Sequence, residues 1–204
     1  MSDLTKNALA DSLARILETK SLEDIKINDI TSDCGISRMT FYYHFKNIYD
    51  LIGWIIKREV IAAIKESSNS SNPEVTLYNI LLSIRKKRNF ILRVERSITG
   101  EQVNGMLTPM INDLMINFFD HLLSDIKIDE NDKIFLITCY EYALMGAVMQ
   151  WVHGEMSDDP KALAHRLWTL AISSFSAHVE AFTEKNYNDS NHNEEELDKS
   201  QSNL

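Results

Sequence analysis

Apolar residues recur at helical spacing along most of the chain. Leu9, Leu13, Ile16 and Leu17 are separated by the three- and four-residue steps that place side chains on one face of a helix, here predicted over residues 4–19. Similar patterns predict further helices over residues 48–66, 74–87, 88–99, 106–124, 133–153 and 161–182. The chain has only 6 Gly and 3 Pro among 204 residues, few for a β-rich protein. The sequence therefore predicts an all-α fold.

Residues 26–45 read as two short helices joined by a tight turn. Gly35 can adopt the left-handed backbone that ends a helix, and Ser37 can cap the helix that follows. Phe41 and Phe45 lie four residues apart, on what we expect to be the inward face of that second helix. The other positions on the second helix are Arg38, Met39, Thr40, Tyr42, Tyr43 and His44, most of which carry hydrogen-bonding groups.

This arrangement is typical of a helix-turn-helix, in which the second helix enters the major groove of DNA. The alternative is an ordinary helical hairpin inside a core. Such a hairpin has no reason to place Arg, Thr, two Tyr and a His on one short helix, so we favour the DNA-binding interpretation.

The net charge of −9 is unevenly distributed, which reconciles it with DNA binding. Residues 1–60 carry 8 Lys+Arg and 9 Asp+Glu, whereas residues 183–204 carry 2 and 6. The acidic groups therefore lie mostly outside the helix-turn-helix, where Arg38 and Lys46 supply local positive charge. The acidic remainder would discourage non-specific binding to DNA.

Beyond residue 66 the sequence predicts a second domain. Residues 67–73 are Ser- and Asn-rich and end in Pro73, the composition of a linker. The helix predicted over 133–153 is apolar on nearly every side, so we expect one side to face another subunit. After residue 182 almost nothing is apolar, and we predict a disordered acidic tail over 183–204.

The stretch DITSDCGISRMTFYYHF, followed by Lys46, Asn47 and Leu51, resembles the N-terminal signature of the TetR/AcrR (tetracycline-repressor-like) family of transcriptional regulators. The resemblance is specific over residues 3–63, which we call the reading head, and looser over 73–182. It implies an N-terminal three-helix helix-turn-helix domain and a C-terminal helical domain, over 64–182, for ligand binding and dimerisation. It also implies a homodimer that binds a palindromic DNA operator.

Carried over by position, the resemblance assigns DNA-binding roles within the reading head. Ser37 would cap the recognition helix, and Arg38, Met39 and Thr40 would face base edges. Contacts to phosphates and the groove wall would come from Tyr42, Tyr43, His44 and Lys46. Two positions depart from the family pattern: Ile48 replaces a phosphate-contacting lysine, and Lys26 replaces a Ser or Thr cap, which costs roughly 0.5–2 kcal/mol.

The second domain is rich in flexible and aromatic side chains, which suit an apolar or amphipathic small-molecule effector. The predicted wall residues of an effector site are Phe90, Met110, Met115, Phe118, Tyr140 and Met149. A basic cluster, comprising Arg85, Lys86, Lys87, Arg88, Arg93 and Arg96, could hold an anion, although a solvated helix surface is the simpler interpretation.

The sequence offers little support for enzymatic or metal chemistry. His121, His153, His165 and His178 lack metal-binding spacing, and Cys34 and Cys139 read as reduced, packed thiols. No catalytic constellation, cofactor motif or phosphate loop is present. No uninterrupted apolar run reaches the ~18 residues of a membrane span. The N-terminus lacks a signal pattern, so we expect a cytoplasmic protein without a membrane partner.

Two functions remain open at this point. The first is a transcriptional repressor released by a small-molecule effector. The second is a DNA-binding adaptor or activator whose C-terminal domain recruits a protein partner without a small ligand. The sequence identifies neither the effector nor the operator.

Overall fold

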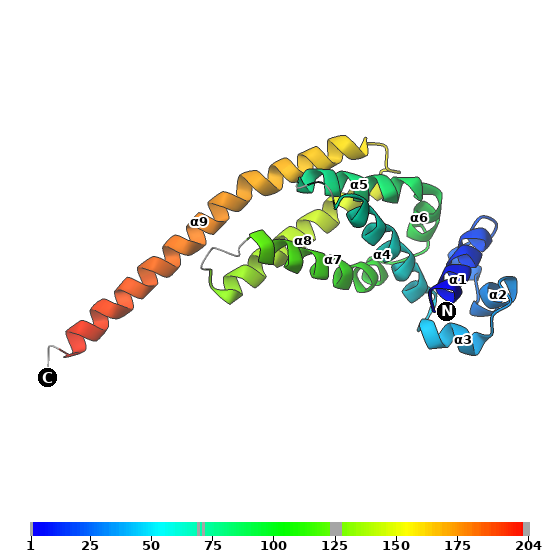
Figure 1. Ribbon diagram of the computed structural model, residues 1–204, viewed down its shortest axis with the longest axis horizontal. Coiled ribbons are helices and arrows are strands. Elements are labelled where there is room, and N and C mark those ends of the chain that lie inside the picture. Colours follow the sequence, from blue (N-terminus) through cyan, green and yellow to red (C-terminus); the bar gives the residue numbers. More distant parts are fainter. Residues whose placement is uncertain (1, 69, 71, 123–127, 202–204) are drawn as a thin grey trace. The chain divides into compact units, whose positions relative to one another are not determined.

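The computed structural model describes the backbone of residues 2–68, 70, 72–122 and 128–201, and the side chains of these except 2, 117, 120–122, 176 and 182–201. Every regular element in these ranges is helical, as predicted (Figure 1). The elements are α1 (Ser2–Leu17), the short 3₁₀ helix η1 (Leu22–Asp24), α2 (Ile27–Asp33), α3 (Arg38–His44), α4 (Ile48–Glu66), α5 (Pro73–Lys86), α6 (Arg88–Glu95), α7 (Gly100–Leu122), α8 (Glu130–His153) and α9 (Pro160–Gln201).

The chain forms two compact units. The first comprises residues Met1–Met110 and Gly146–His165, and the second comprises Ile111–Met145 and Arg166–Leu204. Helices α5 and α6 therefore belong to the same unit as the reading head, and α7, α8 and α9 each contribute to both units.

The reading head is organised around a core shared by α1, α2, α3 and α4. Leu13, Ile30, Phe41 and Leu51 come from these four helices in turn, and each is fully buried. The hydroxyl of Ser12 on α1 donates a hydrogen bond to the carbonyl oxygen of Ile30 at 2.9 Å, which ties α1 to α2. The two short helices, α2 and α3, thus obtain from packing against α1 and α4 the stability that neither would have alone.

A second core of the first unit joins α5 and α6 to the corner between α8 and α9. It contains Leu81, Leu92, Trp151, Val152, Met156 and Ala164. The corner is held in unusual backbone geometry, because Glu155 and Met156 have φ angles of 56° and 54°. The amide of Met156 donates to the Trp151 carbonyl at 2.8 Å, closing the end of α8. Helix α8 ends at His153, and the residues with left-handed backbone beyond it are Glu155 and Met156.

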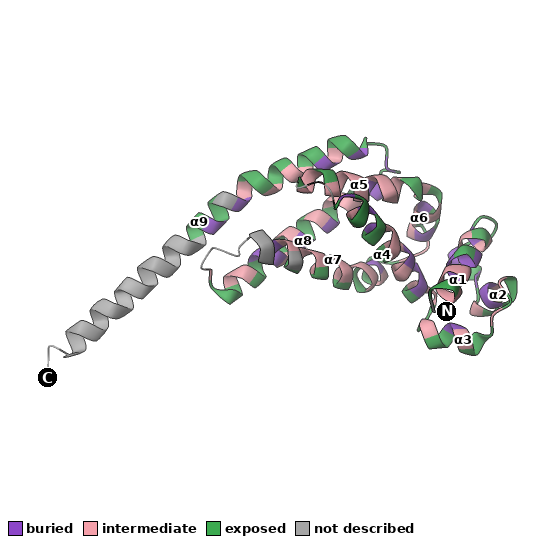
Figure 2. Cartoon of the chain, viewed as in Figure 1, coloured by how far each residue is buried: buried purple, intermediate pink, exposed green. Residues whose placement is uncertain are grey.

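The second unit has an aromatic core between α7, α8 and α9. Phe119, Ile137, Phe175 and Val179 form its centre. Phe119 stacks against Phe175 with ring centroids 5.6 Å apart. Outside this core several apolar residues of α8 and α9 remain exposed: Ile134, Phe135, Tyr142, Leu170 and Ile172. Exposed residues are coloured green in the cartoon of Figure 2.

Two predicted boundaries differ from the structure. The predicted break between Gly100 and Gly105 is absent, because Thr99 and Gln102 cap α7 reciprocally and the helix starts at Gly100. Helix α9 continues to Gln201, past the predicted end at residue 182 and through most of the predicted disordered tail. No Gly or Pro after Pro160 stops it. The turn predicted over 126–130 lies partly outside the described residues.

Helix α8 is also long and apolar enough to cross a membrane, by length and composition. Its most apolar 18-residue window has a mean hydropathy of 1.2, and 28% of that window is buried. The window includes polar residues such as Thr138 and Glu141, so it is not an uninterrupted apolar run. A core or interface helix of a globular protein has the same composition, so this feature alone indicates only that α8 has apolar surface to cover.

The start of α2 shows how the chain compensates for the missing cap at Lys26. The Lys26 side chain makes no cap hydrogen bond, but the carboxylate of Asp29 accepts the Lys26 backbone N–H at 3.0 Å. This hydrogen bond, followed by the charge of Lys20, lowers the pKa of Asp29 from its ordinary value of 3.8. The ionised carboxylate therefore stabilises the folded reading head at pH values above 3.8, and its contribution is lost as the pH falls through the lower folded-state pKa.

We therefore expect Asp29→Asn to lower the free energy of unfolding at neutral pH, and the difference from the wild type to shrink below about pH 4. Urea unfolding followed by circular dichroism between pH 7 and pH 3 measures this. Asp11→Asn, at an exposed carboxylate on α1, serves as the control. A difference between wild type and Asp29→Asn that does not change with pH would contradict the assigned role of the charge.

Candidate nucleic-acid interface

Helix α3 begins with a complete local cap. Gly35 has a φ of +68°, the left-handed conformation predicted for the turn. Ser37 is the N-cap residue, and its hydroxyl oxygen accepts the Thr40 backbone N–H at 3.1 Å. The two hydroxyls of Ser37 and Thr40 also lie 2.8 Å apart. The cap fixes where the helix starts and thus which side chains face outward.

The two faces of α3 differ sharply in burial. Phe41 is 0% exposed and Phe45, just after the helix, is 3% exposed, so both pack inward as predicted. On the opposite face Met39 and Tyr43 are each 83% exposed. Tyr42 and Arg38 are also exposed, whereas Thr40 and His44 are half-buried. Helix α3 thus exposes Arg38, Met39, Tyr42 and Tyr43 to solvent on one side, while its other side packs into the reading-head core.

The start of α4 lies directly after this helix and is capped by its own residues. The side chain of Asn47 accepts the Asp50 backbone N–H at 2.9 Å, and the Asp50 carboxylate accepts the Lys46 backbone N–H at 2.9 Å. The Lys46 side chain is exposed. It therefore supplies a second exposed cation close to the exposed face of α3.

A groove of about 470 Å³ lies where η1, α2, α3 and α4 begin. Its lining comprises Leu22, Glu23, Ile25, Lys26, Ile27, Asn28, Arg38, Asn47, Ile48 and Tyr49. Of these, the sequence had identified only Arg38 as a candidate DNA contact. Asn28 and Tyr49 had no signal of their own, because their proximity to Arg38 depends on tertiary packing. Ile48 is half-buried against the reading-head core.

The structure places the six predicted effector-wall residues in different surroundings. Met115, Phe118 and Tyr140 all pack against the aromatic core of the second unit. Phe90 instead packs against the reading-head core, and Met110 and Met149 are half-buried residues of the first unit. The structure therefore brings together three of the six.

Hydrogen bonds add polar groups to this aromatic core. The Tyr140 hydroxyl lies 2.8 Å from the Ser174 hydroxyl and 3.2 Å from Nδ1 of His178. Asn112 donates to the buried carboxylate of Glu141 at 3.2 Å. Apolar walls with a few polar groups are typical of sites for small organic ligands.

Cysteine and metal-ligand side chains do not gather into a site among the described residues. No three His, Cys, Asp or Glu side chains there are placed to hold a metal ion. Burial raises the pKa of the half-buried Cys34 thiol. Cys139 is exposed on α8, whereas the sequence suggested that it was packed. Side-chain placement of His121 lies outside the described residues.

Comparison with known families and proteins agrees with this geometry. Residues 71–173, half of the chain, match a TetR family model described as "Transcriptional regulator C-terminal region". A 68-residue stretch is 26% identical to the HTH-type dhaKLM operon transcriptional activator DhaS of Lactococcus lactis subsp. lactis (strain IL1403). This stretch spans 33% of the present chain and 36% of that relative, about a third of each.

Solved structures share the fold. The dihydroxyacetone kinase operon activator DhaS superposes with a TM-score of 0.61 at 17% identity, covering 88% of this chain and 98% of that one. A TetR transcriptional regulator from Streptococcus agalactiae 2603V gives 0.56 at 17% identity, with 83% and 94% covered. A tetR-family regulator from Streptomyces coelicolor gives 0.53 at 13% identity, with 90% and 88% covered.

The family match across the C-terminal half, the shared helical fold and the capped helix-turn-helix with its exposed recognition face lead to one conclusion. The chain belongs to the TetR family of transcriptional regulators.

Proposed function

We propose that this regulator is a repressor that binds a palindromic operator as a homodimer and is released by an apolar or amphipathic small molecule. The observation that carries the DNA-binding part is the exposed face of α3. Met39 and Tyr43 project into solvent from a helix whose other face is fully buried. Apolar and aromatic groups on the surface of a monomer need a partner, and the major groove fits a helix of this size.

Within this proposal the residues of the reading head divide into two groups. Arg38, Met39 and Thr40 lie in the first turn of α3, where base edges are reached, and Ser37 caps that turn. Tyr42, Tyr43, His44 and Lys46 follow and would contact phosphates or the groove wall. The reading head would span residues 3–63 and the regulatory domain 64–182, and the regulator would act in the cytoplasm without catalysing a reaction.

The dimer is supported by apolar surface that one subunit leaves uncovered. On α8, Phe135 is 59% and Tyr142 65% exposed, and on α9 Leu170 is 61% exposed. Phe135, Cys139 and Tyr142 are spaced four and three residues apart, so they share one face of α8. A two-fold contact of α8 and α9 with a second copy would cover these groups.

The effector is supported by the second unit. Met115, Phe118 and Tyr140 combine adaptable and aromatic apolar surface with the polar groups of Tyr140, Ser174 and His178. A ligand that prefers one arrangement of the two reading heads would shift DNA binding by its difference in affinity. The three other predicted wall residues, Phe90, Met110 and Met149, stay predictions.

A second candidate is an activator. Both the sequence relative and one structural neighbour are named as activators of a dihydroxyacetone kinase operon. In that case the regulatory domain would recruit a protein partner. In vitro transcription from a promoter containing a genomically mapped site separates the two: a repressor lowers the transcript and an activator raises it.

For the repressor we expect a transcript that falls with added protein and recovers with at least one compound from a panel of apolar and amphipathic molecules. A transcript that rises with added protein would favour the activator. The same assay with a promoter whose site has been scrambled controls for non-specific binding.

The two cations of the reading head should behave differently on substitution. Arg38→Ala should relax specificity at one base pair per half-site, since a bidentate pair with guanine contributes about 1–3 kcal/mol of discrimination. Lys46→Ala should weaken binding evenly across sequences and lower the salt slope by about one per lost phosphate contact. Titrations against single-base operator variants at several salt concentrations measure both.

Lys65→Ala, at an exposed position in the last turn of α4, is the matched control and should leave both quantities unchanged. Ile48→Lys gives the converse test, because a new phosphate contact would steepen the salt dependence. Parallel slopes for wild type and Ile48→Lys would show that residue 48 does not face the DNA backbone.

The dimer contact predicts a clear change in association. Leu170→Asp places a charge on the exposed apolar face of α9, so it should yield monomers that lose operator binding. Val75→Asp, at an exposed apolar residue of α5, should stay dimeric. Sedimentation velocity at micromolar concentration measures both variants, and a wild-type protein that sediments as a monomer would refute the dimer.

A further inference from the structure

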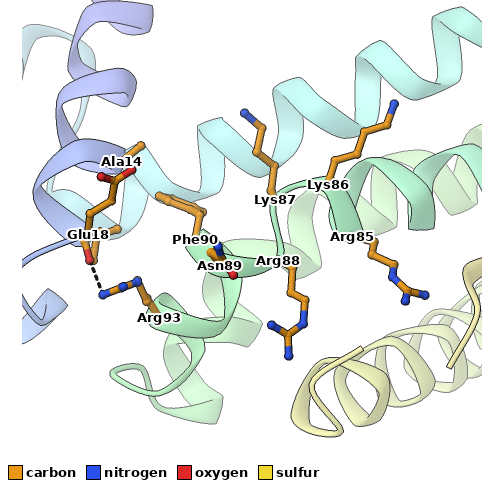
Figure 3. A pocket seen from close by; sticks show the side chains of 10 residues that line it. Ala14, Glu18, Arg85, Lys86, Lys87, Arg88, Asn89, Phe90 and Arg93 are labelled. Carbon is orange, nitrogen blue, oxygen red and sulfur yellow. Dashed lines mark hydrogen bonds between the residues drawn. The ribbon is translucent and has the colours of Figure 1, made fainter. Parts of the chain in front are cut away.

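A groove of about 420 Å³ separates the last turns of α1 from the junction of α5 and α6 (Figure 3). It belongs to the first compact unit throughout and shares no lining residue with the groove at the starts of α2, α3 and α4. We call it the basic groove, and its lining comprises Ala14, Leu17, Glu18, Arg85, Lys86, Lys87, Arg88, Asn89, Phe90 and Arg93.

The charge of the lining is strongly positive. Five of its side chains are cationic and one, Glu18, is anionic. The chain as a whole has a net charge of −9, so this concentration of cations is opposite to the average of the molecule. Like charges held together repel, and a bound anion would relieve that repulsion.

Two of the arginines in the groove are held in place by backbone carbonyl oxygens. Arg85 donates to the backbone carbonyl of Asp158 at 3.0 Å, and Arg93 donates to the carbonyl of Leu17 at 2.9 Å. A carbonyl oxygen orders a guanidinium group but carries no net charge to cancel it. Both groups therefore keep their full positive charge in a defined place.

The carboxylates near the other cations are shared. Glu155 accepts from both Arg88, at 2.9 Å, and Arg96, at 3.2 Å. Glu59 lies 2.9 Å from Arg58 and only 3.8 Å from Lys87. One negative charge thus serves two positive ones in each case, and no described residue pairs with Lys86.

The start of α6 also favours a negative charge at the groove. It has no side-chain cap hydrogen bond and no acidic residue in its first turn. The first N–H groups of a helix and its dipole both favour a negative charge at that end. Here the chain supplies Lys87 and Arg88 at this end instead, which an anion would offset.

The arrangement in Figure 3 indicates where the anion lies. Lys86 and Lys87 leave the α5–α6 junction on one side, Arg85 and Arg88 leave on the other, and Asn89 and Phe90 lie between them and α1. The two pairs point away from each other, so an anion on the lysine side meets Lys86 and Lys87. Phe90, Leu17 and Ala14 provide an apolar wall next to it.

We propose that the basic groove binds a small phosphorylated molecule, with the phosphate beside Lys86 and Lys87 and an apolar body against Phe90 and α1. The volume suits a small organic ligand. The site is separate from the aromatic core proposed for the effector. Its test measures ligand binding to the free protein and does not depend on the operator or on the direction of regulation.

Calorimetric titration of the purified full chain with phenyl phosphate, inorganic phosphate and phenol tests the proposal. We expect saturable binding of both phosphates, tighter for phenyl phosphate than for inorganic phosphate, and none for phenol. Added sodium chloride should weaken the binding, because exposed charges are screened.

Lys86→Gln and Lys87→Gln should each weaken phenyl phosphate binding about tenfold, the usual loss for one charge-assisted hydrogen bond. Lys65→Gln changes the net charge equally at an exposed site outside the groove, so it should leave the affinity unchanged. Thermal melts of each variant show that the fold is retained.

Three results would overturn the proposal. The first is no saturable binding of either phosphate at low salt. The second is an equal loss in Lys65→Gln and Lys86→Gln, which would indicate a general charge effect. The third is binding of only long polyanions, such as heparin or an acidic peptide, which would make the groove a docking surface for a macromolecule.

Discussion

The burial of Phe41 is the interaction on which the DNA-reading surface depends. Helix α3 has seven residues, too few to be stable in water by itself. Phe41 is fully buried between α1, α2 and α4, and the Ser37 cap fixes the residue at which the helix begins. Each residue of an α-helix is rotated by a fixed angle from the one before. Turning Phe41 inward therefore also turns Met39 and Tyr43 outward. The exposed face is therefore a consequence of the core.

The same balance between burial and exposure underlies the proposed contact with a second subunit. Helix α8 is apolar on nearly every side, yet only 28% of its most apolar window is buried within one chain. The aromatic core of the second unit covers one side through Phe119 and Ile137, and the opposite apolar groups stay in water. Exposing apolar surface of this kind to water raises the free energy of the single chain, and burying it in a contact with a second subunit would lower that free energy.

Charge is arranged differently in the two parts of the first unit. In the reading head, the carboxylates of Asp29 and Asp50 accept the backbone N–H groups of Lys26 and Lys46. These hydrogen bonds satisfy N–H groups at the starts of α2 and α4, next to the two lysines. At the α5–α6 junction the first turn of α6 contains no acidic residue, and backbone carbonyl oxygens hold Arg85 and Arg93. Acidic residues of the reading head thus satisfy its helix starts, whereas part of the positive charge at the α5–α6 junction is left without a carboxylate.

The sequence by itself determined the helical elements of the reading head, because caps and periodicity are local. Gly35 and Ser37 predicted the turn and the start of α3, and each has the expected role in the structure. Local signals did not predict that α7 would include Gly105 or that α9 would continue past residue 182. Thr99 and Gln102 cap the start of α7, and no Gly or Pro after Pro160 ends α9. Only the tertiary structure decided which distant residues meet. It packed Phe90 against the reading-head core and Phe118 against the aromatic core, joined Arg93 to the end of α1, and placed Tyr49 and Arg38 in the lining of one groove. Such contacts depend on how helices pack and not on their spacing along the chain.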